Sequence, residues 1–168
     1  INPNDLSILV IGSFFSIRTE NFEVISEIVQ TAIENEIIFV YDPNVRNKEL
    51  YKDEELLGRI QYYFQSADIV KASAEDMERI TGSKDDSIWK SFMADCNVDR
   101  YIITNGPGNV FVNHFEEQFN FEVPQVELIS TVGAGDAFTA GLVSCLNFIG
   151  NKSTNIESFL KAVSMGIT

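Results

Sequence analysis

The residues best suited to chemistry lie in one stretch, residues 130–141, which reads STVGAGDAFTAG. Gly133 and Gly135 precede the acid Asp136, and the apolar residues that follow recur at three- and four-residue spacing, which predicts a helix. The first turn of a helix has N–H groups without intrahelical partners and carries partial positive charge. Glycines also lack the Cβ atoms that would keep a ligand away from those amides. The stretch therefore predicts a helix start that binds an anion such as phosphate.

The acid in this stretch, Asp136, has two interpretations. Beside a phosphate it could accept the proton of a hydroxyl group that attacks phosphorus. It could equally serve the helix alone, because any acid in a first turn interacts favourably with the helix dipole. The spacing of the residues leaves both interpretations open.

Composition narrows the function classes. The chain has 168 residues, 45% of them hydrophobic, which is enough for one domain with a substantial core. Its 12 basic and 25 acidic residues give a net charge of −13, so it has neither the basic footprint of a nucleic-acid-binding protein nor an attraction to anionic membranes. The apolar runs are far shorter than a membrane span, and a cytoplasmic location is expected. Cys96 and Cys145 belong to no CxxC pattern, which favours buried, reduced thiols over a disulfide.

Strand and helix patterns alternate along the chain, which predicts a single α/β domain over residues 1–168 with a doubly wound, mostly parallel sheet flanked by helices. We expect parallel strands at residues 6–11, 37–41, 67–71 and 100–104. The first of these is a continuous apolar run, which is typical of a buried strand. Residues 110–113 and 119–123 predict a small antiparallel hairpin at the sheet edge, with His114 exposed in its turn.

Candidate site segments begin where predicted strands end. They read GSFFS, DPNVR, KASAED and TNGPG. Ligands of such sheets bind in the crevice outside the carboxyl ends of the strands, so these segments are expected to share one site. A dinucleotide-binding oxidoreductase domain would need GxGxxG after the first strand, and Gly12 is instead followed by Ser-Phe-Phe, so that function is excluded.

The string STVGAGDAFTAGL resembles the signature DTxGAGDxFxxG of the ribokinase-like (PfkB) carbohydrate kinases. The resemblance implies that Asp136 is the catalytic base and that the backbone amides of Gly133, Ala134 and Gly135 form the anion hole. It also assigns Thr131 to cofactor binding. Ser130 replaces the Asp that leads the family signature and helps to bind a monovalent cation in some members, which puts a potassium site in question.

The segment DPNVR resembles the corresponding segment of fructokinase-like members, where its Arg lies in the sugar or phosphate region. The resemblance implies substrate-binding roles for Arg46 and Asn44. A simple turn with a surface Arg is the alternative, because Pro and Asx residues form turns without any ligand.

Two further segments resemble family motifs. Ser73 and Asp76 occupy the ends of an NxxE-like motif, which implies that Ser73 binds the cofactor and that Asp76 acts through water on Mg²⁺. An N-cap Ser with acids in the first turn explains the same residues without a metal. Thr104, Gly106 and Gly108 resemble a TxGxxG segment that borders the nucleotide, although the last glycine is one residue early.

The resemblance implies an ATP-dependent, magnesium-dependent sugar kinase of fructokinase type, with a small sugar and ATP as its partners. It covers about the C-terminal half of a family member. The N-terminal sugar-binding strands and the lid are absent from it, so we expect the chain by itself to be incomplete for activity and the intact protein to be a candidate homodimer. A non-catalytic sugar- or nucleotide-sensing relative is the alternative function, since several motif positions depart from the family.

Overall fold

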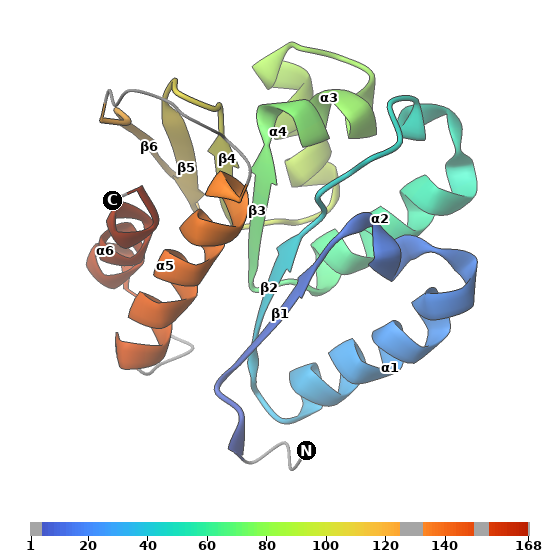
Figure 1. Ribbon diagram of the computed structural model, residues 1–168, viewed down its shortest axis with the longest axis horizontal. Coiled ribbons are helices and arrows are strands. Elements are labelled where there is room, and N and C mark those ends of the chain that lie inside the picture. Colours follow the sequence, from blue (N-terminus) through green and yellow to red (C-terminus); the bar gives the residue numbers. More distant parts are fainter. Residues whose placement is uncertain (1–4, 125–132, 150–154, 168) are drawn as a thin grey trace.

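Six strands form one mixed sheet in which neighbours along the chain are also neighbours in space. The computed structural model describes residues 5–124, 133–149 and 155–167. The strands are β1 (Ile8–Gly12), β2 (Ile38–Asp42), β3 (Ile69–Ser73), β4 (Arg100–Thr104), β5 (Val110–His114) and β6 (Glu117–Phe121). β1 to β4 are parallel, and β5 and β6 are antiparallel at one edge, as Figure 1 shows. The predicted mostly parallel sheet with an edge hairpin is confirmed.

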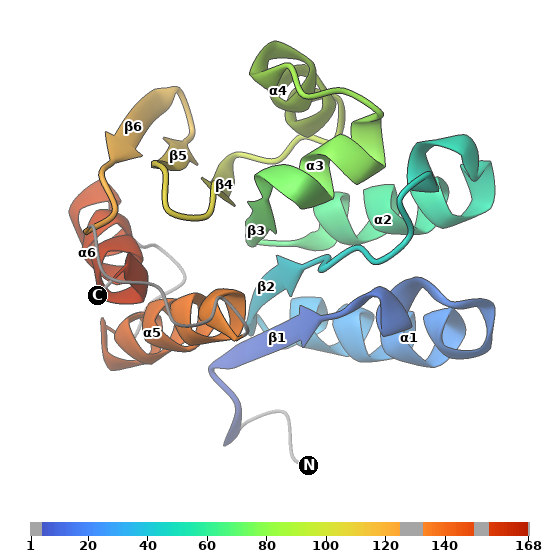
Figure 2. The same ribbon diagram turned by 45° about the horizontal axis from the view of Figure 1, so that its top comes forward.

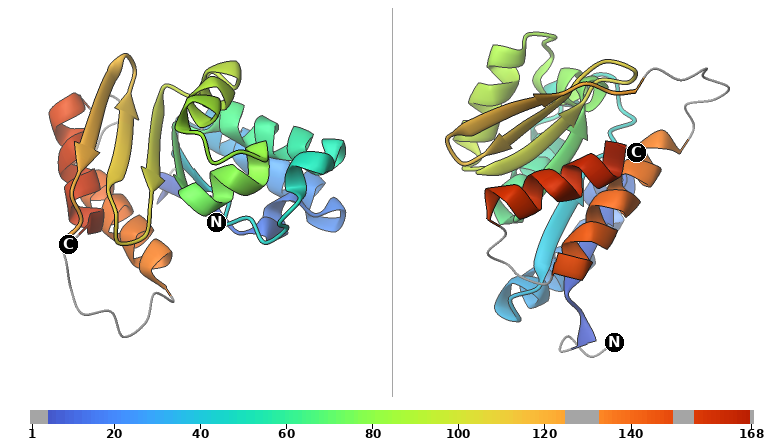
Figure 3. Two further views of the ribbon diagram at one scale, coloured as in Figure 1. Left: turned by 90° about the horizontal axis from the view of Figure 1, so that it is seen from above. Right: turned by 90° about the vertical axis from the view of Figure 1, so that its left-hand side faces the viewer.

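Helices cover both faces of this sheet. Those on one face are α1 (Thr19–Glu34), α2 (Glu54–Ser66), α3 (Ala74–Thr81) and α4 (Asp86–Asp95), with short 3-10 helices at Phe14–Ile17 and Leu50–Lys52. On the opposite face lie α5 (Ala134–Ile149) and α6 (Ile156–Ile167), which pack against each other (Figures 2 and 3). The two-sided helical layers confirm the predicted α/β fold. Among the described residues, no helix is long and apolar enough to cross a membrane.

Alternate side chains of the strands divide between two cores, one under each helical layer. In β2, Phe39 and Tyr41 point to the α1–α4 side, where the Tyr41 and Tyr63 rings lie 4.9 Å apart. The neighbouring residue Val40 faces α5 and α6 and packs in the second core with Leu142 and Phe159. All six side chains are fully buried. The sheet is therefore held from both sides, which fixes the ends of its strands relative to α5.

Two expectations about burial were wrong. β1 is an edge strand rather than a buried one: Val10 is 40% exposed, and α5 and α6 pack over β2 to β5 instead. His114 is buried rather than exposed, because its ring lies 5.3 Å from that of Phe159, against α6. Both errors concern which layer covers a strand, and local sequence patterns do not contain that information.

Candidate active site

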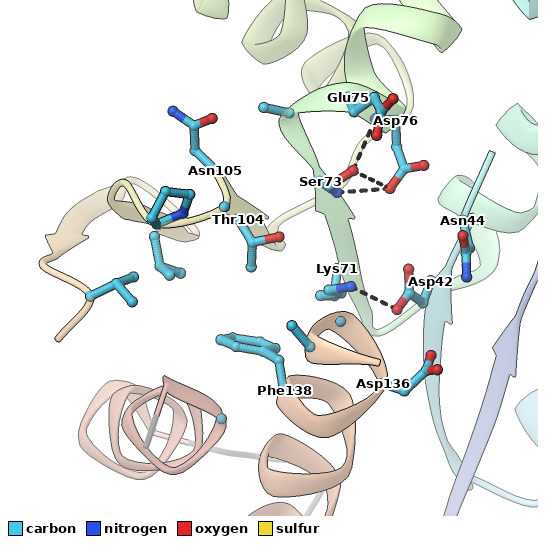
Figure 4. Close-up of a pocket in the computed structure, with 18 of the residues that line it drawn as sticks. Asp42, Asn44, Lys71, Ser73, Glu75, Asp76, Thr104, Asn105, Asp136 and Phe138 are labelled. Atoms are coloured by element: carbon cyan, nitrogen blue, oxygen red, sulfur yellow. Dashed lines mark hydrogen bonds and ion pairs between the residues drawn. The ribbon is translucent and has the colours of Figure 1, made fainter. Parts of the chain in front are cut away.

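A cavity of about 740 Å³ opens at the carboxyl ends of β2, β3 and β4, with the first turn of α5 on its opposite side. Its volume is typical of a small-molecule site. Figure 4 shows Asp42 and Asn44 from the β2 segment, Ser73 from the end of β3 and Asp136 from α5 around one space. Three of the four predicted site segments thus meet there. GSFFS does not line this cavity.

Most of the predicted site residues line the cavity together. They are Asn44, Arg46, Ser73, Asp76, Thr104, Gly106, Gly133, Ala134, Gly135 and Asp136. Gly108 is absent from the lining: its N–H donates to the carbonyl oxygen of Asn105 at 2.8 Å, which closes the turn after β4. Thr131 and Ser130 lie outside the described residues.

The start of α5 has the geometry expected of an anion site. Gly133 has a φ of +84°, in the left-handed region that favours glycine. The N–H of Ala137 donates to the carbonyl oxygen of Gly133 at 2.8 Å, so the N–H groups of residues 134–136 precede the first intrahelical bond. Asp136 is exposed to the cavity. The turn thus combines amide donors with a carboxylate that a ligand can reach.

The segment after β2 is fixed by α3. Asn44 has a φ of +41°, and the next N–H, that of Val45, donates to Oδ1 of Asp76 at 2.7 Å. The guanidinium of Arg79 donates to the carbonyl oxygen of Val45. Arg46 itself is exposed at the cavity. The sequence did not point to Arg79, whose role is to hold this segment in place.

The carboxylate of Asp76 is engaged by protein donors on both oxygens. Besides the Val45 bond, its Oδ2 accepts the N–H of Ser73 at 2.9 Å and the hydroxyl of Ser73 at 2.6 Å, and Asp76 N donates back to that hydroxyl. This is a capping box at the start of α3. Among the described residues, no group of three His, Cys, Asp or Glu side chains is arranged to hold a metal. Direct metal ligation by Asp76 therefore does not fit, and its predicted action through water stays a prediction.

A buried ion pair at the base of the cavity was not predicted. Lys71 Nζ donates to Oδ2 of Asp42 at 2.9 Å, and both side chains are at most 10% exposed. The same oxygen accepts the hydroxyl of Thr139, from α5, at 3.1 Å. Burial raises the pKa of Asp42 above its ordinary value, while the Lys71 ammonium opposes that rise.

One sequence signal could have revealed this pair. Opposite charges end the apolar runs of two successive predicted strands, as Asp42 after IFVY and Lys71 after IV. The parallel register of β2 and β3 pairs Tyr41 with Val70, so the next residues along, Asp42 and Lys71, are neighbours. A charge at the carboxyl end of a buried strand needs a partner, and the adjacent strand supplies it.

The far side of the cavity is less polar. Thr104 ends β4, and Gly106 in the following turn has a φ of +52°. Val110, Phe138 and Ile167 add apolar surface from β5, α5 and α6. The cavity can therefore hold a ligand that is anionic at one end, next to α5, and apolar at the other.

A family model described as "pfkB family carbohydrate kinase" matches residues 4–155. Among curated proteins, the chain is 33% identical over 123 residues to a fructokinase of Escherichia coli, covering 71% of this chain and 40% of the relative. It is 30% identical over 108 residues to aminoimidazole riboside kinase of Salmonella typhimurium, covering 64% of this chain and 34% of the relative.

Solved structures show the same fold. An aminoimidazole riboside kinase from Salmonella enterica, in complex with aminoimidazole riboside and an ATP analogue, has a TM-score of 0.83 at 23% identity over 98% of this chain and 57% of that one. A fructokinase variant from Vibrio cholerae, with fructose, ADP and potassium bound, has a TM-score of 0.82 at 22% identity over 99% and 55% of the two chains. The chain thus spans little more than half the length of these two solved structures, and its matches cover 40% or less of the two curated relatives.

Proposed function

The chain belongs to the pfkB family of carbohydrate kinases, and from this premise we propose that the intact protein transfers the γ-phosphoryl group of ATP to a hydroxyl of a sugar, fructose or a related keto sugar. One observation supports this most strongly. The exposed Asp136 and the amide-rich start of α5 line the same cavity as the ends of β2, β3 and β4.

In the proposed mechanism, Asp136 accepts the proton of the attacking sugar hydroxyl. The amides of Gly133, Ala134 and Gly135 neutralise charge on the transferring phosphoryl group, assisted by the dipole of α5. Mg²⁺ enters as part of the Mg·ATP substrate. The chain's own residues hold the phosphoryl group, orient the hydroxyl and remove its proton.

The remaining predicted residues divide between the two substrates. We assign Ser73, Thr104, Gly106 and Thr131 to the nucleotide side. Gly108, which does not line the cavity, is assigned to this side only through the turn that it closes after β4. We assign Arg46 and Asn44 to the sugar or its phosphate. The exposed guanidinium of Arg46 supports this assignment, because it provides positive charge at the cavity of a protein whose net charge is −13.

Asp136→Asn in the intact protein tests the central role. We expect kcat to fall by at least about 10²-fold with ATP affinity nearly unchanged, because the amide cannot accept the hydroxyl proton. Asp86→Asn is the matched control, since Asp86 is also an exposed acid in a first helical turn, that of α4. If Asp136 served only the helix dipole, both variants would keep near-normal turnover, and the proposed base would be refuted.

The acceptor is identified by a coupled ADP-release assay with fructose, ribose and aminoimidazole riboside as candidate substrates. We expect the highest kcat/KM with fructose. An intact protein that binds ATP and a sugar but phosphorylates none of them would instead be the non-catalytic sensor.

A further inference from the structure

The buried ion pair of Lys71 and Asp42 connects three elements at the base of the cavity. Asp42 ends β2, Lys71 lies in β3, and Thr139 lies in the second turn of α5. The Thr139 hydroxyl is 3.1 Å from Oδ2 of Asp42 and 3.0 Å from the carbonyl oxygen of Gly135. This hydroxyl therefore joins the first turn of α5 to the ion pair.

Lys71 also contacts that first turn directly. A Cβ atom added at Gly135 would lie 3.2 Å from Nζ of Lys71, so the ammonium packs against the glycine itself. In Figure 4 the Lys71 side chain lies just above the start of α5 and points toward Asp42. The ammonium of Lys71 thus lies between the end of β2 and the first turn of α5.

The electrostatics of this contact favour an anion. The ammonium of Lys71, paired with Asp42, lies next to the positive end of the α5 dipole. A phosphoryl group at the amides of residues 133–135 would interact favourably with both. Burying an ion pair is costly, and apolar replacements of such pairs are often equally or more stable, so stability alone is a weak reason for this one.

We propose that Lys71 is a positioning residue of the phosphoryl-transfer site: held by Asp42, its ammonium sets the first turn of α5 and supplies positive potential behind the anion hole. This inference rests on the function proposed above. It predicts that turnover depends on the charge of Lys71. Stability should fall only when one charge of the buried pair is removed and the other is left without its partner.

The test compares two variants of the intact protein. Lys71→Met alone leaves the Asp42 carboxylate buried without its partner, and we expect it to lower stability. The double variant Lys71→Met/Asp42→Asn removes both charges, and we expect wild-type stability or better. Lys84 is 82% exposed and is not among the residues that line the cavity, so Lys84→Met is the control and should change neither turnover nor stability.

For the double variant we expect kcat to fall by about 10–10²-fold, while KM for the sugar changes by less than about threefold. ATP affinity, measured by calorimetry, should fall by about three- to tenfold. A double variant with wild-type folding and kcat within threefold of wild type would overturn the proposal, since the pair would then serve the fold alone.

ATP affinity separates this inference from the proposed function. If the wild-type protein binds ATP but phosphorylates no sugar, the kinase function fails, and the ATP affinity of the double variant decides the role of Lys71. A loss of threefold or more would support it, and a smaller loss would overturn it. A wild-type protein that does not bind ATP would overturn both.

Discussion

Alanine substitutions at two glycines inside helices measure how closely α5 packs against α6. Replacing a mid-helix glycine by alanine normally stabilises a helix by about 0.8–1 kcal/mol. At Gly58 in α2 an added Cβ meets nothing within 4 Å, so Gly58→Ala should show this full gain. At Gly141 in α5 the added Cβ would lie 2.5 Å from the carbonyl oxygen of Met165 in α6, closer than real Cβ contacts come.

The Gly141→Ala variant must therefore push α6 away or strain its backbone. Overpacking of this kind costs about 1–3 kcal/mol, and subtracting the helix gain leaves a net loss of about 0–2 kcal/mol. The two variants should thus differ by about 1–3 kcal/mol in free energy of unfolding, with the opposite sign of change at Gly58. Because Gly166 and Ile167 of α6 line the cavity, ATP affinity should fall in Gly141→Ala only.

Urea unfolding of the intact protein, followed by circular dichroism, measures the difference between the variants. Both substitutions have the same chemistry and the same helix propensity, so only the surroundings distinguish them. Equal stabilisation by Gly141→Ala and Gly58→Ala would refute the close packing of α5 on α6. It would also remove the reason for a glycine at position 141.

Two further predictions concern buried groups. Burial, with a smaller contribution from the Asp95 carboxylate, raises the pKa of the Cys96 thiol from 9.0 to about 11. In a Cys145→Ser background, where Cys96 is the remaining cysteine, iodoacetamide should therefore label Cys96 about 10²-fold more slowly at pH 8 than an ordinary thiol. Because this pKa is raised in the folded state, Cys96 contributes stability below pH 9 that is lost as the pH rises through 11. Fast labelling at pH 8, or a free energy of unfolding that does not change between pH 9 and 11, would contradict the raised pKa. Asp76→Ala removes both the acceptor of the buried Val45 N–H and the capping box of α3. It should lower the free energy of unfolding in urea by about 2 kcal/mol or more. The control is Glu75→Ala, at an exposed side chain, which should change that free energy little. A loss below about 0.5 kcal/mol for Asp76→Ala would mean that its hydrogen bonds are replaced by water.

The sequence by itself determined the local structure well. The strands predicted at residues 37–41 and 100–104 form β2 (Ile38–Asp42) and β4 (Arg100–Thr104), within one residue of their predicted bounds. The positions of the strand ends predicted that four segments share one site, and the segments after β2, β3 and β4 do line one cavity, whereas GSFFS does not. These features depend on contacts within a few residues, where side-chain period and backbone preference act directly.

Only the tertiary structure decided which distant groups touch. The pairing of Asp42 with Lys71 depends on the register of β2 against β3, and their link to Thr139 depends on how α5 lies across the sheet. The burial of His114 under α6 and the exposure of Val10 in β1 depend on which part of the sheet the second helical layer covers. Sequence periodicity gives each element its apolar face but not its neighbour, because docking is set by the summed packing of the whole core. For that reason the chain's own signature predicted the glycine-containing start of α5, whereas the fold was needed to show that the buried lysine packs against it.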